Sequence, residues 1–287
     1  MMSANSRLPD TARIGQIRLA ISDLEQSLNF YTRVLGLSVQ AKSHDFAALT
    51  AHNASRVLIE LQQLPGLQPL AKASRLGLYH FALLLPTRAD LASFVEHLAA
   101  HKIRFGSSDH TVSEALYLTD PDGIHIEVYA DRPRAQWAYS EGEIVLTSHE
   151  LHFHDLLAVP HRIWSAAPAN TTLGHLHFWV SDLKLAHQFY CEGVGFEVMH
   201  SSFDGVVFIS AGGYHHHVGL NTWAKGARLT EATDPRLLSW ELLLESEVQV
   251  HEVAERLRQA GFTEAVDPWQ NKLLPAIRGE NSRPGTC

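Results

Sequence analysis

The chain has little of what marks exported or membrane proteins. Only two of its 287 residues are cysteine. Cys191 lies in a stretch with helical spacing and Cys287 ends the chain, so they form no disulfide framework and favour a reducing compartment. No apolar run approaches the ~20 residues of a membrane span. The start, MMSANSRLPDTARIG, lacks the basic-then-apolar pattern of a signal peptide, so we expect a cytoplasmic protein without a membrane partner.

Basic residues are also few. The formal net charge is -8 and lysine and arginine form no stripe, which argues against a nucleic-acid partner. Hydrophobic residues make up 45% and charged residues 19%, as in a globular protein long enough for two domains. Histidine, in contrast, occurs 19 times. Imidazole binds transition metals and transfers protons near neutral pH, so this excess directs attention to a metal site.

The chain repeats itself. IGQIRLAISDLEQSLNFYTRVLGLSV begins at Ile14 and aligns without a gap with LGHLHFWVSDLKLAHQFYCEGVGFEV, which begins at Leu173, 159 residues later. Both copies contain Ser-Asp-Leu, Phe-Tyr and a following glycine, Gly36 or Gly195. Alternating apolar residues predict an opening strand, Ser-Asp predicts the cap of a helix, and the glycine predicts its end.

A second unit is related to the first. It starts at YHFALLLPTRADLASFVEHLAAHKI and ends at EALYLTDPDGIHIEVYADRP, and SWELLLESEVQVHEVAERLRQAGF followed by VDPWQNKLL is a fainter copy. The pattern predicts four strand-helix-strand-strand-strand modules, at about residues 14–62, 76–130, 172–223 and 237–277. We expect an N-terminal domain over 1–135 with the first two modules, a linker over 136–171, and a C-terminal domain over 172–287 with the last two.

The repeated SDL…FY…LG opening and the DPDGxxIEVY ending resemble the vicinal oxygen chelate superfamily, which includes glyoxalase I, bleomycin-resistance proteins and the type I extradiol dioxygenases. The resemblance covers nearly the whole chain. The module order and the linker are most similar to the CatE-like catechol-2,3-dioxygenase family. The resemblance implies an α+β fold in which each βαβββ module forms half a barrel and two modules enclose a metal-bearing cavity.

Alternation along each strand separates side chains that face such a cavity from those that pack on the helices. The histidine triplet in GGYHHHVGLN is assigned in this way: His216 alternates with the apolar Val218 and Leu220 and is expected to be structural. The other packing positions include Tyr79 and Phe81. The predicted cavity set is His80, Tyr117, His125, Glu127, Tyr129, His175, His177, Trp179, His215, His217, Gly219 and Asn221.

In extradiol dioxygenases, two histidines from the opening strands of paired modules and one late glutamate hold a non-haem Fe(II). By resemblance these are His80, His175 and Glu127, a set that also accepts Mn(II) or another divalent ion and leaves positions open for a chelating substrate and O2. The resemblance further assigns the acid–base role to His217, with His215 as the rival, and a hydrogen-bonding role to Tyr117. The residues expected around the substrate are His110, His177, His215, Asn221 and Trp223.

The chain departs from the four-module extradiol dioxygenases in one respect. Their site joins the third and fourth modules, but here the fourth module has Ser239 and Leu274 where ligands should stand. The ligand set is complete only if the second module pairs with the third, which leaves a degenerate cavity between the first and fourth. The competing arrangement pairs the first and second modules and offers Gln16, Glu60, His80 and Glu127, a set similar to that of glyoxalase I.

One hypothesis of function and two alternatives follow. The first is an extradiol ring-cleaving dioxygenase that acts on catechol or a substituted catechol with O2 at a mononuclear Fe(II). The alternatives are a glyoxalase I-like lyase or isomerase that uses a divalent metal without O2, and a bleomycin-resistance-like protein that binds a small molecule without metal. The sequence leaves open the ring substituents and whether the protein is a monomer or a homo-oligomer.

Overall fold

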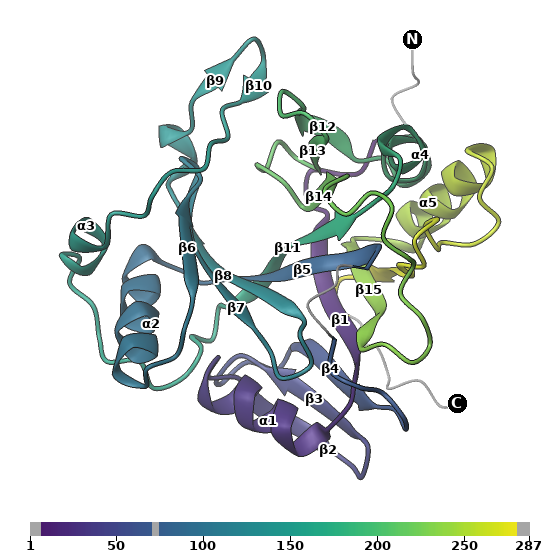
Figure 1. Cartoon of the computed structure of the whole chain (residues 1–287). Helices are drawn as coiled ribbons and strands as arrows, with labels where there is room; N and C mark the ends of the chain where they lie inside the picture. The colour runs from purple at the N-terminus through teal and green to yellow at the C-terminus, as the bar shows by residue number, and fades with distance from the viewer. Residues whose placement is uncertain (1–6, 71–74, 280–287) are drawn as a thin grey trace.

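Two large β-sheets form the body of the protein (Figure 1). The computed structural model describes residues 7–70 and 75–279. The six-stranded sheet has the order β16 (Leu273–Ile277), β15 (Arg236–Leu244), β1 (Arg13–Ile21), β4 (Val57–Gln63), β3 (Phe46–Thr50) and β2 (Ser38–Lys42). The eight-stranded sheet has the order β12 (Glu197–His200), β13 (Val206–Ser210), β14 (Val218–Asn221), β11 (Thr172–Trp179), β5 (Gly77–Leu84), β8 (His125–Asp131), β7 (Ser113–Thr119) and β6 (Gly106–Asp109).

Each sheet joins modules from opposite sides of the linker. The opening strand β1 pairs antiparallel with β15, and β5 pairs antiparallel with β11. The second module therefore pairs with the third, which is the arrangement that a complete ligand set requires. In the competing arrangement Gln16 and Glu60 would join the other ligands, but they lie in the six-stranded sheet, where Glu60 faces Arg18 at 3.8 Å. The division of the chain at 135 and 172 stays a prediction.

The fourth module is shorter than the other three. It consists of β15, the helix α5 (Glu247–Gln259) and β16, and within the described residues it has no counterparts of β2 and β3. β15 and β16 are parallel, as β1 and β4 are. The α+β fold of half-barrel modules is thus the predicted one, with two strands missing from its last repeat.

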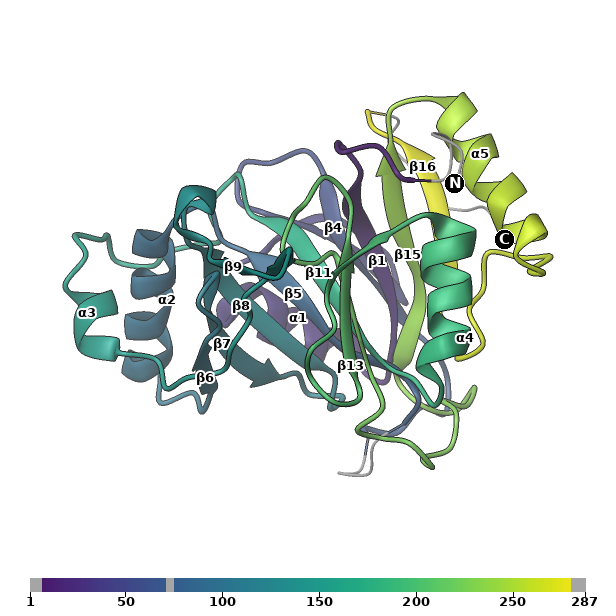
Figure 2. The same cartoon turned by 90° about the horizontal axis from the view of Figure 1, so that it is seen from above.

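Helices cover the outer sides of the sheets (Figure 2). They are α1 (Leu24–Arg33), α2 (Arg88–Ala100), α4 (Leu183–His187) with its π-helical continuation η2 (Gln188–Val194), and α5. The Asp23 carboxylate accepts from the Gln26 N–H and Asp182 accepts from the N–H groups of Lys184 and Leu185, so Ser-Asp-Leu caps a helix in both repeats, as predicted. None of the described helices has the length and apolar character to cross a membrane.

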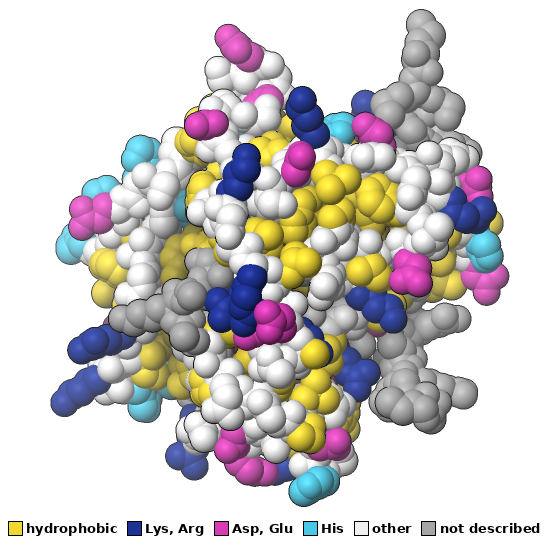
Figure 3. Space-filling view, turned by 45° about the vertical axis from the view of Figure 1, so that its right-hand side comes forward, with side chains coloured by type: hydrophobic (Ala, Val, Ile, Leu, Met, Phe, Trp, Pro, Cys, Tyr) yellow, Lys and Arg dark blue, Asp and Glu magenta, His cyan; other side chains and the backbone are white. Residues whose placement is uncertain are grey.

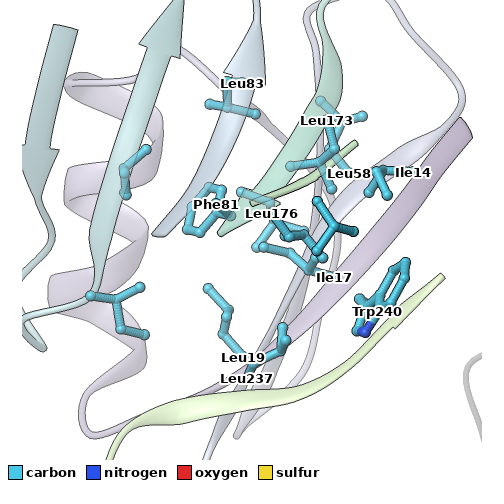
Figure 4. Close-up of a cluster of buried hydrophobic side chains, with 14 of the residues drawn as sticks. Ile14, Ile17, Leu19, Leu58, Phe81, Leu83, Leu173, Leu176, Leu237 and Trp240 are labelled. Atoms are coloured by element: carbon cyan, nitrogen blue, oxygen red, sulfur yellow. The ribbon is translucent and has the colours of Figure 1, made fainter. Parts of the chain in front are cut away.

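The largest core lies between the two sheets (Figure 4). Ile17 and Trp240 from the six-stranded sheet meet Phe81 and Leu176 from the eight-stranded sheet, and all four are fully buried. The apolar half of each alternating strand is used here, so the polar half of β5, β8 and β11 faces the opposite side of its sheet. On the surface seen in Figure 3, acidic and basic side chains are interspersed among apolar ones.

The Phe-Tyr and Asp-Pro motifs form the same buried hydrogen bond twice, from a tyrosine hydroxyl to an aspartate carboxylate. We call each of these bonds a Tyr–Asp tie. The Tyr31 hydroxyl donates to Asp120 at 3.0 Å, and the Tyr190 hydroxyl donates to Asp267 at 2.7 Å. Both carboxylates also accept two backbone N–H bonds. Burial raises the pKa of Asp120 to about 7 and that of Asp267 to about 6, so each carboxyl depends on these donors. The tie links the first module to the second and the third to the fourth.

Removing either hydroxyl should therefore destabilise the fold. We expect Tyr31→Phe and Tyr190→Phe each to lower the free energy of unfolding by about 1–3 kcal/mol, because a buried carboxyl loses a donor. Urea denaturation followed by circular dichroism measures the change. Tyr139→Phe is the control, since Tyr139 is 56% exposed and should change stability by less than about 0.5 kcal/mol. Equal effects in all three variants would refute the structural role of the ties.

The linker packs against the eight-stranded sheet. It contains the 3-10 turn η1 (Arg134–Gln136), the short strands β9 (Tyr139–Ser140) and β10 (Glu143–Ile144), and α3 (Phe153–Leu157). Trp137, Ile144 and Leu146 are buried in one cluster with Val112. The linker therefore covers part of the polar face of this sheet.

Candidate metal centre

Three neighbouring strands bring the predicted ligands together. Ala82 on the central β5 lies beside Glu127 of β8 on one side and His175 of β11 on the other. His80 is two residues before Ala82 and so points to the same face. Because Ala82 ends at its methyl group, the three longer side chains surround an open position above it. The pairing of β5 with β8 and with β11 at these positions therefore builds the group His80, Glu127 and His175.

The distances within this group fit a metal ion. The Nε2 atoms of His80 and His175 are 3.4 Å apart, and each lies 3.1 Å from Oε2 of Glu127. Metal–ligand bonds of about 2.1 Å place two ligands at a right angle about 3.0 Å from each other. The three atoms thus have the spacing of three adjacent corners of an octahedron. Two imidazoles and one carboxylate on one face is the donor set of non-haem iron sites.

Burial strengthens this interpretation. His80, Glu127 and His175 are 4%, 3% and 1% exposed. Burial by itself raises the pKa of Glu127, but the two imidazoles outweigh it and hold that pKa well below its usual range. Burial also lowers the pKa of His80. An anionic carboxylate beside a neutral imidazole is the protonation state that a metal ion needs from its ligands. In the described part of the chain, the Nδ1 atoms of both histidines have no hydrogen-bond partner.

His216 is the member of the triplet that faces the metal centre. Its ring centroid lies 4.1 Å from that of His175, and it lines the same cavity as His80 and Glu127. His215 stands behind it, fully buried, with Nε2 2.8 Å from Asp131 and Nδ1 2.7 Å from Nδ1 of His216. The Asp131 carboxylate can only accept, so Nε2 of His215 donates to it and Nδ1 accepts from His216. Nε2 of His216 is then an unprotonated base that faces the cavity.

His217, the predicted acid–base residue, lies elsewhere. Its Nδ1 is 2.7 Å from the Ser210 hydroxyl, and its ring lines a second cavity that shares no lining residue with the first. Strand alternation does not extend to the triplet, because β14 begins only at Val218. The preceding segment turns at Gly212 and Gly213, which have φ angles of 61° and 62°. Strand alternation thus predicts the reverse of what the structure has: His216 lines the cavity of the candidate metal centre and His217 lines the other one. The acid–base role assigned to His217 stays a prediction.

Tyr117 and His110 form a pair on the opposite wall. His110 Nδ1 is 2.8 Å from the carbonyl oxygen of Thr147 and so carries a proton, which leaves its Nε2 to accept from the Tyr117 hydroxyl at 2.6 Å. Burial raises the pKa of Tyr117 well above its usual value, so the phenol stays protonated. Both residues line the cavity, as predicted, and Thr147 of the linker fixes their orientation.

The remaining predicted residues divide into two groups. His177 and Trp223 line the cavity, and Trp223 is 63% exposed at its rim. Asn221 is fully buried and does not line it, but its amide lies 2.9 Å from Nε2 of His177 and holds that ring. His215 likewise acts from behind, through His216. Two of the residues expected to touch substrate, Asn221 and His215, thus contact residues that line the cavity and do not line it themselves.

The cavity has a volume of about 440 Å³, within the usual range for small-molecule sites. Its apolar walls come from residues that the sequence motifs do not single out: Val112, Leu146, Phe203, Val206 and Phe208. The ring of Tyr79, which was expected to pack on the helix side, is part of the lining and stacks on Trp179 at 4.4 Å. The pairing of β5 with β11 shifts register between His177 and Phe178, opposite Tyr79, so alternation fails there.

Sequence comparisons show to which known proteins the chain is similar. Residues 13–128 match the family model described as Glyoxalase/Bleomycin resistance protein/Dioxygenase superfamily. The catechol-2,3-dioxygenase of Bacillus subtilis strain 168 is 41% identical over 259 residues, which cover 88% of this chain and 90% of that protein.

Solved structures support the fold. A crystal structure from Bacillus subtilis, provisionally assigned as a dioxygenase, covers 96% of this chain and 87% of its own, with a TM-score of 0.65 and 11% identity. A mutant of glyoxalase I from Zea mays covers 93% of this chain and 94% of its own, with a TM-score of 0.55 and 13% identity. The four-module architecture and the extended identity lead to one conclusion: the chain belongs to the glyoxalase/bleomycin resistance protein/dioxygenase superfamily.

Proposed function

We propose that the protein is an extradiol ring-cleaving dioxygenase that acts on catechol or a substituted catechol with O2 and Fe(II). The observation that carries the proposal is the convergence of His80, His175 and Glu127 on one point of a cavity that also holds the base His216. The name of the Bacillus subtilis relative, a catechol-2,3-dioxygenase 41% identical to this chain, supports the same reaction class.

The metal and the protein have separate tasks. A bound Fe(II), or Mn(II) in its place, supplies acidity to coordinated hydroxyl groups and open positions for a diol and O2. His80, His175 and Glu127 would hold it. Because one ligand is negative and two are neutral, a divalent ion in this group would keep part of its positive charge, which would attract the anionic oxygen atoms of the substrate.

His216 moves the proton. Its Nε2 accepts a proton from a catechol hydroxyl and later returns one to the reacting oxygen, and this work typically contributes about 10²–10⁴-fold to a rate. Nδ1 of His216 is fixed by His215, which Asp131 fixes in turn. The arrangement holds the ring in one tautomer, and Asp131 stabilises the positive charge that develops when His216 takes the proton.

The cavity selects the shape of the substrate. Val112, Leu146, Val206 and Phe208 form apolar walls on which an aromatic ring can pack, while Tyr117 presents a hydroxyl to its oxygen atoms. No lysine or arginine is among the described lining residues, so the walls offer no cation for a charged ring substituent. The geometry favours an uncharged catechol.

Oxygen uptake tests the proposal. The protein is loaded with Fe(II) without air, mixed with catechol and exposed to O2 in an oxygen electrode. We expect stoichiometric uptake and growth of the yellow colour of a ring-opened semialdehyde. Hydroquinone, whose para hydroxyls cannot chelate one metal, is the matched control and should give neither signal. Tightly bound Ni(II) or Zn(II) without uptake would favour the lyase alternative, and ligand binding that is independent of metal would favour the binding protein.

A further inference from the structure

A second cavity lies where the two sheets meet, and the proposed dioxygenase reaction does not use it. Its volume is about 470 Å³. The floor is apolar and includes Ile14, Leu58, Leu173 and Leu243. The first three lie together at one end of the core in Figure 4. These residues come from the two sheets together, so the cavity exists only in the assembled fold.

Four arginines surround the cavity: Arg13, Arg56, Arg134 and Arg278. Such a group is unusual in a chain with a net charge of -8. All four side chains line this one cavity. Burial is the main effect that lowers the pKa of Arg13 and of Arg56; Arg278 lowers both further, and at Arg56 Glu241 acts in the opposite direction with a larger effect than Arg278. Like charges held together at a concave surface are costly unless an anion joins them.

Little negative charge within the protein balances the group. Arg56 lies 3.9 Å from Glu241. Arg13, Arg134 and Arg278 form no ion pair with an aspartate or glutamate of the described residues, and Asp10 is the weakest of the influences on the pKa of Arg13. Their hydrogen bonds go instead to backbone carbonyl oxygens, of Asp10, Ala12, Thr11, Gly212 and Gly213. Each of these bonds uses one nitrogen of a guanidinium that has five N–H donors, so the others stay available.

His217 adds a donor at the bottom of the cavity. It is 2% exposed and lines the cavity. Its Nδ1 accepts from the backbone N–H of Ala211 at 3.3 Å and lies 2.7 Å from the Ser210 hydroxyl, so the proton of the neutral ring is on Nε2. That N–H is a hydrogen-bond donor of a residue that lines the cavity, and an acceptor atom of a ligand can bond to it.

We propose that this cavity, lined by Arg13, Arg56, Arg134, Arg278 and His217, is a binding site for a small organic carboxylate. The guanidinium groups at the rim bind the carboxylate, for which their planar forks are suited, and the apolar floor holds a hydrocarbon body. An inorganic anion would use the rim but leave the floor without contacts. The site is separate from the metal centre, although the adjacent residues His216 and His217 line one cavity each.

Calorimetric titration of the full-length, metal-loaded protein with 4-bromobenzoate tests the site, with 4-bromobenzamide as the neutral probe of the same shape. We expect the carboxylate to bind at least about tenfold more tightly than the amide. Arg13→Gln and Arg278→Gln should each weaken it about 10- to 100-fold, the usual value of a charged hydrogen bond. Arg104→Gln is the matched control, because Arg104 is exposed and lies outside the cavity.

The bromine atom locates the ligand independently of the variants. A crystal soaked in 4-bromobenzoate should give an anomalous peak among Ile14, Leu58 and Leu173. A peak only at the metal centre, no peak at all, or affinity that is the same in Arg13→Gln, Arg278→Gln and Arg104→Gln would overturn the proposal. These outcomes are independent of oxygen uptake with catechol, so the two proposals can fail separately.

Discussion

Replacing His175 by alanine is expected to abolish both metal binding and oxygen uptake. Nε2 of His175 lies 3.1 Å from Glu127 and 3.4 Å from Nε2 of His80, so its loss removes one corner of the ligand triangle. Loss of a residue behind a ligand typically costs about 10–100-fold in metal affinity, and loss of the ligand itself should cost more than about 100-fold. His80→Ala and Glu127→Ala should behave alike. Elemental analysis after dialysis against a known free Fe(II) concentration measures the change.

His125→Ala is the matched control for these variants. His125 lies beside His80 in the sheet but belongs to a different cavity and not to the ligand group. It should keep the metal and the stabilisation that metal gives, about 2.7 kcal/mol when free metal is a hundred times the dissociation constant. If His175→Ala retained one tightly bound metal per chain, or if His125→Ala lost it, the ligand assignment would be wrong.

A second large effect is expected from His216→Gln. The proton acceptor is lost while the three ligands stay, so kcat should fall by about 10²–10⁴-fold with unchanged metal content and little change in KM. Stopped-flow measurement of yellow product with Fe(II)-loaded protein gives both constants. The decrease in kcat should be caused by the loss of the imidazole base, because glutamine can replace the hydrogen bond of His216 to His215 but cannot take up a proton.

His217→Gln decides between the two adjacent histidines. Its ring is bound to Ser210 and lines the arginine-rich cavity, so its replacement should cost far less in kcat than that of His216. A variant pair with the opposite order, His217→Gln nearly inactive and His216→Gln nearly unaffected, would return the acid–base role to His217. Far-UV circular dichroism checks that both variants are folded.

The candidate metal centre could be predicted because the three residues assigned as its ligands lie at positions where the strands alternate. His80, Glu127 and His175 alternate with buried residues such as Phe81, Val128 and Leu176 over several positions, and a period of two leaves no choice of face. The pairing of the second module with the third followed from the chemistry of the ligands. Ser239 and Leu274 of the fourth module cannot hold a metal, whereas the second module supplies the histidine and the glutamate that the set needs beside His175.

Other features of the site could not be read from strand periodicity. The triplet precedes β14, so the one residue assigned to packing, His216, is the one whose ring lies against His175 and lines the cavity of the candidate metal centre. The wall formed by Leu146 and Thr147 comes from the linker, whose path depends on the packing of Trp137 and Ile144 against Val112. Arg13 and Arg278 lie at the two ends of the chain, and no local pattern relates them. The paired Tyr–Asp ties could have been noticed, since Phe-Tyr and Asp-Pro both recur.

The pairing of β1 with β15 also constrains how the chain folds during its synthesis. β1 begins at Arg13 and its neighbour β15 begins at Arg236, so β1 waits for a strand that is made more than two hundred residues later. Closing so long a loop is slow, and until then the edge of β1 that pairs with β15 has no partner strand. Nascent chains of this length are thus natural clients for chaperones.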